Sequence, residues 1–201
     1  MIRVLVADDQ HLVRGALAAL LALEDDIEVV GQVGRGDQMV AEALRSGPDV
    51  ALVDIEMPGM DGIAATGALR AALPGCRVLI LTTFGRPGYL RRAMEVGASG
   101  FMVKDAPAAE LADAVRRVSQ GYRVVDPVLA AESLATGHNP LTGRERDVLR
   151  AARSGGTVGD IARAVSLGKG TVRNYLSSAI GKTAARTRAE AVRVAEERGW
   201  L

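Results

Sequence analysis

The first 121 residues alternate between two hydrophobic periods. Short apolar runs rich in Val, Ile and Leu, each bounded by Gly, Pro or Asp, predict buried strands. They read IRVLVA, IEVVGQV, DVALVD, CRVLILTT and GFMVK. Helical spacing between these runs predicts five helices, near residues 11–24, 37–46, 62–72, 87–97 and 107–120. Strands and helices in alternation favour right-handed βαβ units, so we expect a flavodoxin-like α/β domain whose parallel sheet has the order 2-1-3-4-5.

The alternation ends after residue 121. Residues 122–139 hold Pro, Gly and Asn around a short Leu/Ala stretch, which predicts a linker with one helical piece. Residues 140–201 show only helical periodicity, broken at Gly-rich turns, and predict four short helices. We therefore expect an α/β domain over 1–121 and an all-α domain over 140–201.

The charges divide at the same place. Residues 1–121 contain 12 Arg and Lys against 16 Asp and Glu, a net of −4. Residues 140–201 contain 12 against 6, a net of +6. An acidic first part and a basic second part indicate two domains with different partners, and nucleic acid is the leading candidate for the basic one.

The composition argues against membrane and disulfide-rich classes. No apolar run approaches the roughly 18–20 residues that a membrane span needs. The first ten residues, MIRVLVADDQ, meet acidic side chains too early for a signal peptide. The single cysteine, Cys76, cannot form an internal disulfide. The sequence thus predicts a cytoplasmic protein without membrane insertion.

Polar residues with related chemistry follow four of the predicted strands. They are Asp8 and Asp9 after the first strand, Asp54 after the third, Thr82 after the fourth and Lys104 after the fifth. In an open parallel sheet such residues meet beyond the carboxyl ends of the strands. Three close carboxylates repel one another unless a cation lies between them, and Mg²⁺ suits their oxygen ligands. Since Mg²⁺ sites are often completed by phosphate oxygens, we expect a phosphoryl-binding site.

Asp54 is the candidate nucleophile of this site. It opens the segment DIEMPGMDG, in which Pro58 and Gly59 are expected to shape a loop that exposes the carboxylate. An aspartate at a strand end is more often a turn cap. Matching polar residues at four strand ends make that simpler interpretation the weaker one.

The segments VLVADDQ, VDIEMPGMDG, LILTTF and GASGFMVKDA together resemble the receiver domain of two-component response regulators, over about residues 1–121. The resemblance implies that Asp54 is the phosphoacceptor. It also implies that Asp8 and Asp9 bind Mg²⁺ together with Asp54, and that the backbone carbonyl of Glu56 completes the shell.

The same resemblance implies a switch. Thr82 and Lys104 would contact the phosphoryl group, and Phe101 would be the aromatic residue that turns inward when Thr82 moves toward the phosphate. A phosphoryl group adds about −1.5 to −2 charges and new acceptor oxygens. Phe84, two residues after Thr82, would shield the site from water.

The basic part contains a predicted helix-turn-helix. A short helix near 157–165, a Gly-containing turn and a longer helix near 169–182 give this motif. Thr142 and Glu145 form a capping-box pattern that marks an earlier helix start. The longer helix carries the candidate DNA contacts Lys169, Thr171, Arg173, Asn174, Tyr175 and Lys182. Arg pairs with guanine and Asn with adenine, so Arg173 and Asn174 are expected to read bases and the others to contact phosphates.

The segments LTGRERDVL, IARAVSLGKGTVRNYL and RTRAEAVRVA resemble the LuxR/NarL-type DNA-binding domain over about residues 140–201. Two positions depart from the usual pattern: Gly168 stands where Ser often caps the recognition helix, and Tyr175 where His is frequent. A final helix near 187–199 is expected to supply dimer contacts.

The whole chain is similar to NarL/FixJ-type response regulators. This implies that a sensor histidine kinase phosphorylates Asp54, that phosphorylated receivers form a homodimer through their first and fifth helices, and that the dimer binds double-stranded promoter DNA. The segments DIEMPG, LTTFGRPGYL and GTVRNYL resemble the DesR branch, which implies a DesK-like kinase and control of membrane lipids. Two alternatives remain open, a phosphorylation-independent regulator with a structural receiver and an aspartyl-phosphate phosphatase. For the phosphatase, Glu56 would be the nearest substitute for a second acid/base.

Overall fold

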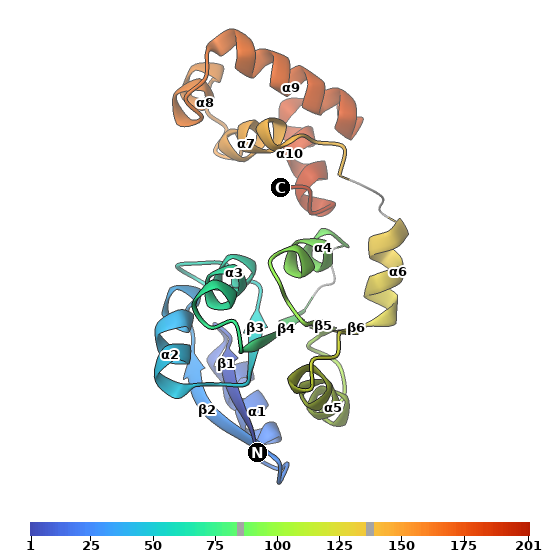
Figure 1. Ribbon diagram of the computed structural model, residues 1–201. Helices are drawn as coiled ribbons and strands as arrows, with labels where there is room; N and C mark the ends of the chain where they lie inside the picture. The colour runs from blue at the N-terminus through green and yellow to red at the C-terminus, as the bar shows by residue number, and fades with distance from the viewer. Residues whose placement is uncertain (84–86, 136–138) are drawn as a thin grey trace. The chain divides into compact units, whose positions relative to one another are not determined.

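The chain forms two compact units. The computed structural model describes residues 1–83, 87–135 and 139–201, and Figure 1 shows the order of the elements along the chain. The first unit comprises most of residues 1–131, and the second is built mainly of residues 132–201. None of the helices in the described ranges combines the length and apolar character that crossing a bilayer requires.

The first unit is built around one parallel sheet of order β2-β1-β3-β4-β5-β6. Its strands are β1 (Ile2–Ala7), β2 (Ile27–Val33), β3 (Val50–Asp54), β4 (Arg77–Thr82), β5 (Gly100–Val103) and β6 (Val124–Val125). The central strand β3 is buried at every position, as its unbroken apolar run predicts. The predicted order 2-1-3-4-5 is confirmed.

The sixth strand corrects the prediction of five. β6 lies inside the predicted linker and pairs with β5 through Gly100–Val124 and Phe101–Val125. A two-residue strand is too short to show a hydrophobic period in the sequence. It forms because the edge of β5 offers backbone groups with which it can pair. The helical piece expected in this segment is α6 (Pro127–Ala135).

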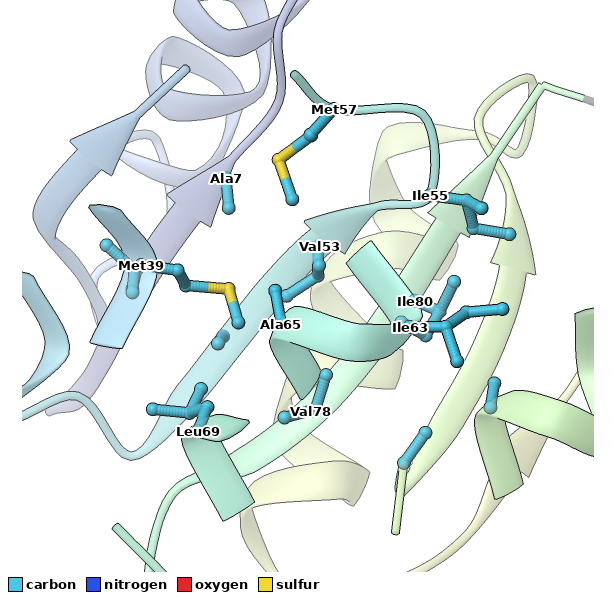
Figure 2. Close-up of a cluster of buried hydrophobic side chains, with 14 of the residues drawn as sticks. Ala7, Met39, Val53, Ile55, Met57, Ile63, Ala65, Leu69, Val78 and Ile80 are labelled. Carbon is cyan, nitrogen blue, oxygen red and sulfur yellow. The ribbon is translucent and has the colours of Figure 1, made fainter. Parts of the chain in front are cut away.

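Helices cover both faces of the sheet. On one face lie α1 (His11–Leu21) and α5 (Ala108–Ser119), whose apolar side chains pack on alternate residues of the strands. On the other lie α2 (Met39–Ser46), α3 (Gly62–Ala72) and α4 (Pro87–Glu95), with the short 3₁₀ helix η1 (Gly36–Gln38) before α2. Figure 2 shows part of this second layer, where Met39 of α2 and Leu69 of α3 lie over Val53 and Val78 of the sheet. All five predicted helices are present.

The second unit consists of α7 (Gly143–Ala152), α8 (Val158–Ala164), α9 (Lys169–Thr183) and α10 (Arg188–Glu197). The predicted capping box is confirmed: the Thr142 hydroxyl accepts a hydrogen bond from the Glu145 N–H, and the Glu145 carboxylate accepts one from the Thr142 N–H. All four helices contribute to a separate core, which includes Leu149, Ile161, Leu176, Ala191 and Trp200.

Candidate functional site

The carboxyl ends of four strands bring the predicted polar residues to one edge of the sheet (Figure 1). Asp8 directly follows β1, Asp54 ends β3, Thr82 ends β4 and Lys104 directly follows β5. The Lys104 N–H donates to the Thr82 carbonyl oxygen at 2.8 Å, which continues the pairing of β4 and β5 to their last residues. Parallel strands therefore fix the spacing of these groups.

An ammonium group bridges two buried carboxylates at this edge. The Nζ atom of Lys104 lies 2.7 Å from Oδ2 of Asp8 and 3.1 Å from Oδ1 of Asp54. The two carboxylates are 1% and 5% exposed. The backbone N–H of Gln10 donates to Asp8 Oδ1 and that of Ile55 to Asp54 Oδ1, both at 2.9 Å. The Lys104 ammonium thus pairs with both carboxylates, and the backbone N–H groups hold the two carboxylates in a fixed orientation.

Burial raises the pKa of the Asp54 carboxyl above its ordinary value. The charge and hydrogen bond of Lys104 act in the opposite direction, and the negative charge of Asp8 adds to the increase. An aspartate that is desolvated and held in this way loses less hydration when it attacks an electrophile than one in water does. Its burial and its contact with Lys104 distinguish it from an exposed turn cap.

The cluster fits a divalent cation. One carboxylate oxygen from each of Asp8, Asp9 and Asp54 lies within 4.8 Å of the other two. Asp9 is exposed, so the group is open to solvent on one side, while Oδ2 of Asp8 is buried beside the Lys104 ammonium. Hard oxygen ligands with room for water are the set that Mg²⁺ prefers.

One residue near the cluster was not predicted from the sequence. The half-buried Arg14 on α1 donates from Nη1 to the carbonyl oxygen of Asp8 at 2.6 Å. This bond holds the backbone between the two adjacent aspartates. A helical Arg six residues after Asp8 gives no sequence signal for such a contact, because the contact depends on how α1 packs against β1.

The loop after Asp54 has a defined shape. The Gly62 N–H donates to the Ile55 carbonyl oxygen at 2.8 Å, and Gly59 has a φ of +80°. A Cβ at Gly62 would lie 1.8 Å from the Asp54 carbonyl oxygen, so only glycine fits there. Glu56 is exposed in this loop, two residues beyond Asp54.

The predicted switch residues lie in the interior. Thr82 is 4% exposed, and Phe101 is fully buried on β5, where its backbone pairs with Ile80 on one side and Val125 on the other. Phe84 falls outside the described residues.

In the second unit, α8 and α9 form a helix-turn-helix with Gly168 at the start of α9. Gly168 makes no side-chain cap, so α9 begins without the hydrogen bond that Ser would supply. Five of the candidate DNA contacts, Lys169, Thr171, Arg173, Asn174 and Lys182, are exposed. Tyr175 is half-buried against the core.

Lys182 is placed differently from the other candidates. Its Nζ lies 2.8 and 2.9 Å from the two carboxylate oxygens of Glu145, and its side chain is 34% exposed. The sequence predicted Glu145 only as a helix cap. Its partner Lys182 lies 37 residues further along the chain, and no local sequence pattern indicates this contact.

Comparison with known families agrees with both units. Residues 4–116 match the response regulator receiver domain, and residues 139–195 match the LuxR family of bacterial regulatory proteins. The chain therefore belongs to the two-component response regulators of the NarL/LuxR type, a family of DNA-binding transcriptional regulators.

Individual relatives resemble it over the full length. The transcriptional regulatory protein DesR of Bacillus subtilis is 44% identical over 201 residues, covering both chains completely. The crystal structure of ChrA, a response regulator of a heme-sensing two-component system, is 32% identical, with a TM-score of 0.59 over 100% of this chain and 98% of that one. An RcsB–DNA complex has a TM-score of 0.70 over 98% of both chains, and at 20% identity this likeness is one of fold.

Proposed function

We propose that the chain is switched by phosphotransfer from a sensor histidine kinase to Asp54, and that the phosphorylated form dimerises and binds promoter DNA. The observation that carries this proposal is the pairing of Lys104 with both Asp8 and Asp54 at the ends of their strands, 2.7 and 3.1 Å away. A lysine in this place can hold a phosphoryl oxygen as soon as Asp54 becomes an acyl phosphate.

The chemistry is a displacement at phosphorus. A carboxylate oxygen of Asp54 attacks the phosphorus of a phosphohistidine, a P–O bond forms and the P–N bond breaks. The imidazole leaves with the bonding electron pair and takes up a proton. Lys104 offsets the negative charge on the transferred group, and the buried position of Asp54 limits its hydration before the attack.

Asp8, Asp9 and Asp54, with the backbone carbonyl of Glu56, would hold Mg²⁺ in this proposal. A bound Mg²⁺ supplies positive charge to the phosphoryl oxygens. The close approach of the three carboxylates supports this role.

The proposed switch uses Thr82 and Phe101. The Thr82 hydroxyl donates a hydrogen bond to a phosphoryl oxygen, and its movement changes the packing available to the Phe101 ring. A shift of a two-state equilibrium from 1:99 to 99:1 needs about 5.5 kcal/mol. Charge-assisted hydrogen bonds contribute about 1.5–3 kcal/mol each, so Thr82 and Lys104 must act together.

Dimerisation and DNA binding form the output. α1 exposes Leu12 and Leu20, which are 87% and 41% exposed, and these side chains support a receiver dimer through α1 and α5. Two basic units in a symmetric dimer would bind half-sites about 10 bp apart or a multiple of that. Arg173 and Asn174 would read bases, with Lys169, Thr171, Tyr175 and Lys182 near phosphates.

The proposal extends to a DesK-like kinase and control of membrane lipids as the output. The 44% identity with DesR over the whole chain supports it. Because the protein acts on chromosomal DNA in this proposal, its place is the cytoplasm.

The test is capture of genomic DNA fragments by the full chain, with and without acetyl phosphate and Mg²⁺, beside Asp54→Asn. We expect enrichment of a small set of promoters only by the treated wild type. Equal enrichment by Asp54→Asn would support a structural receiver, and steady hydrolysis of p-nitrophenyl phosphate would support a phosphatase. Either result would overturn the proposal.

A further inference from the structure

A single buried carboxylate connects the first helix of the DNA-binding unit to its recognition helix. Glu145 is 3% exposed. Its Oε2 accepts a hydrogen bond from the Thr142 N–H at 2.6 Å, and its Oε1 accepts one from the Ser178 hydroxyl at 2.6 Å. The Lys182 ammonium lies within 2.9 Å of both oxygens.

The partners come from two different helices. Thr142 caps α7, whereas Ser178 and Lys182 lie four residues apart on α9 and so share one side of that helix. The carboxylate therefore fixes the start of α7 against the second half of α9. The first half of α9 holds the exposed candidates for base contact, Arg173 and Asn174.

The carboxylate stays ionised at neutral pH. Burial raises the pKa of the Glu145 carboxyl, but the hydrogen bonds from Lys182, Ser178 and Thr142 outweigh burial and bring the pKa down to about 2. A buried negative charge needs a positive partner, and among the described residues Lys182 is its ion-pair partner. If Lys182 turned toward a DNA phosphate, Glu145 would lose that partner.

We infer that Lys182 is the structural counterion of Glu145 rather than a phosphate ligand, and that Glu145 is a positioning residue that sets the recognition helix for DNA binding. The inference rests on α9 being the recognition helix of the proposed function. It replaces one of the phosphate contacts proposed above, and the exposed Lys169 is left as the matched lysine at the other end of the helix.

The experiment uses the full chain in four forms: wild type, Lys182→Met, the double variant Glu145→Gln with Lys182→Met, and Lys169→Met. Two quantities are measured for each form. One is the urea midpoint of the second unit. The other is the affinity for a 30-bp duplex of mixed sequence at several KCl concentrations. Each phosphate contact contributes about 0.9 to the slope of log affinity against log salt.

We expect Lys182→Met to lower the urea midpoint and to weaken DNA binding without changing the salt slope. The double variant should recover most of both losses, because no unpaired buried charge remains. Lys169→Met should leave the midpoint unchanged and reduce the slope by about one contact. If Lys182→Met fails to fold, the double variant still gives the slope in the absence of Lys182.

A double variant that folds as stably as the wild type but loses about 0.9 from its slope would overturn the inference, since Lys182 would then be a phosphate ligand. A double variant that is no more stable than Lys182→Met would also overturn the inference. Failure of the proposed function looks different: the wild type would not bind the duplex, or Lys169→Met would keep the full slope. In either case, the urea midpoints of Lys182→Met and the double variant show whether Glu145 and Lys182 form a stabilising pair.

Discussion

At the scale of single residues, one ammonium group serves two buried carboxylates. Lys104 lies against Asp8 and Asp54, so its charge is shared before any phosphoryl group arrives. An acyl phosphate at Asp54 would add about −1.5 to −2 charges to this small volume. Other donors are then needed, and Thr82 at the end of β4 carries a hydroxyl at this edge of the sheet.

We predict that Thr82→Ala accepts a phosphoryl group but gains no DNA affinity from it. The substitution removes the hydroxyl that would follow the phosphate, while Asp54 and Lys104 remain. Phosphorylation is read by intact mass and DNA affinity by fluorescence anisotropy, before and after acetyl phosphate. An alanine variant whose affinity rises as much as that of the wild type would contradict the switch.

A second prediction concerns Arg14. Loss of its 2.6 Å hydrogen bond to the Asp8 carbonyl in Arg14→Met frees the backbone between Asp8 and Asp9. Groups that orient metal ligands typically change metal affinity 10–100-fold, so we expect Mg²⁺ to bind about tenfold more weakly. Isothermal titration of the full chain measures this directly.

The matched control for Arg14 is Arg45→Met, which removes an exposed arginine paired with Glu42 on α2. It should leave Mg²⁺ affinity at the wild-type value. Equal affinities in Arg14→Met and the wild type would show that Arg14 has no part in the site.

At the scale of elements, the DNA-binding unit depends on how α7 and α9 are joined at Glu145. The folded-state pKa of Glu145, about 2, is below its ordinary value of 4.5. The stabilisation from the ionised carboxylate is therefore complete above about pH 4.5 and is lost as the pH falls toward 2. Helix α7 should loosen from α9 in this acidic range.

We predict that Glu145→Gln is less stable than the wild type at neutral pH, because Lys182 is left without its charged partner, and that the difference shrinks as the pH falls from 4.5 toward 2. Urea unfolding followed by circular dichroism at pH 7, 4.5, 3.5 and 2.5 tests this. A difference that stays constant over the whole range would mean that ionisation of Glu145 does not stabilise the unit.

Most elements were predictable from the sequence because their signals are local. Runs such as VALVD predict a buried strand, and the capping box at Thr142 predicts the start of α7. The strand β6 was missed because two residues carry no period. The Glu145–Lys182 pair and the contact of Arg14 with Asp8 were missed because tertiary packing creates them. The cluster around Asp54 was predictable because the carboxyl ends of parallel strands lie side by side at the same edge of the sheet.

At the scale of the whole molecule, the proposed output requires two chains. Leu12, Leu20 and Leu23 on or just after α1 are 87%, 41% and 77% exposed. Exposed leucines are costly in water and favour association.

We predict that Leu12→Glu with Leu20→Glu abolishes phosphorylation-driven dimers, at a cost of at least about 2 kcal/mol. Phosphorylation itself should persist. Leu44→Glu on α2, which is 58% exposed on the other side of the sheet, is the control and should dimerise normally. Sedimentation velocity distinguishes the two variants, and dimers of unchanged strength in the double variant would exclude α1 from the interface.

In the proposed function, a phosphoryl group on Asp54 changes the assembly of the chain. The most direct test of this change is intact mass together with solution size after treatment with acetyl phosphate and Mg²⁺, for the wild type beside Asp54→Asn. We expect one added phosphoryl group and a shift from monomer to dimer in the wild type alone. A wild type that gains the phosphoryl group without any change in size, or an Asp54→Asn variant that shifts to dimer equally, would contradict it.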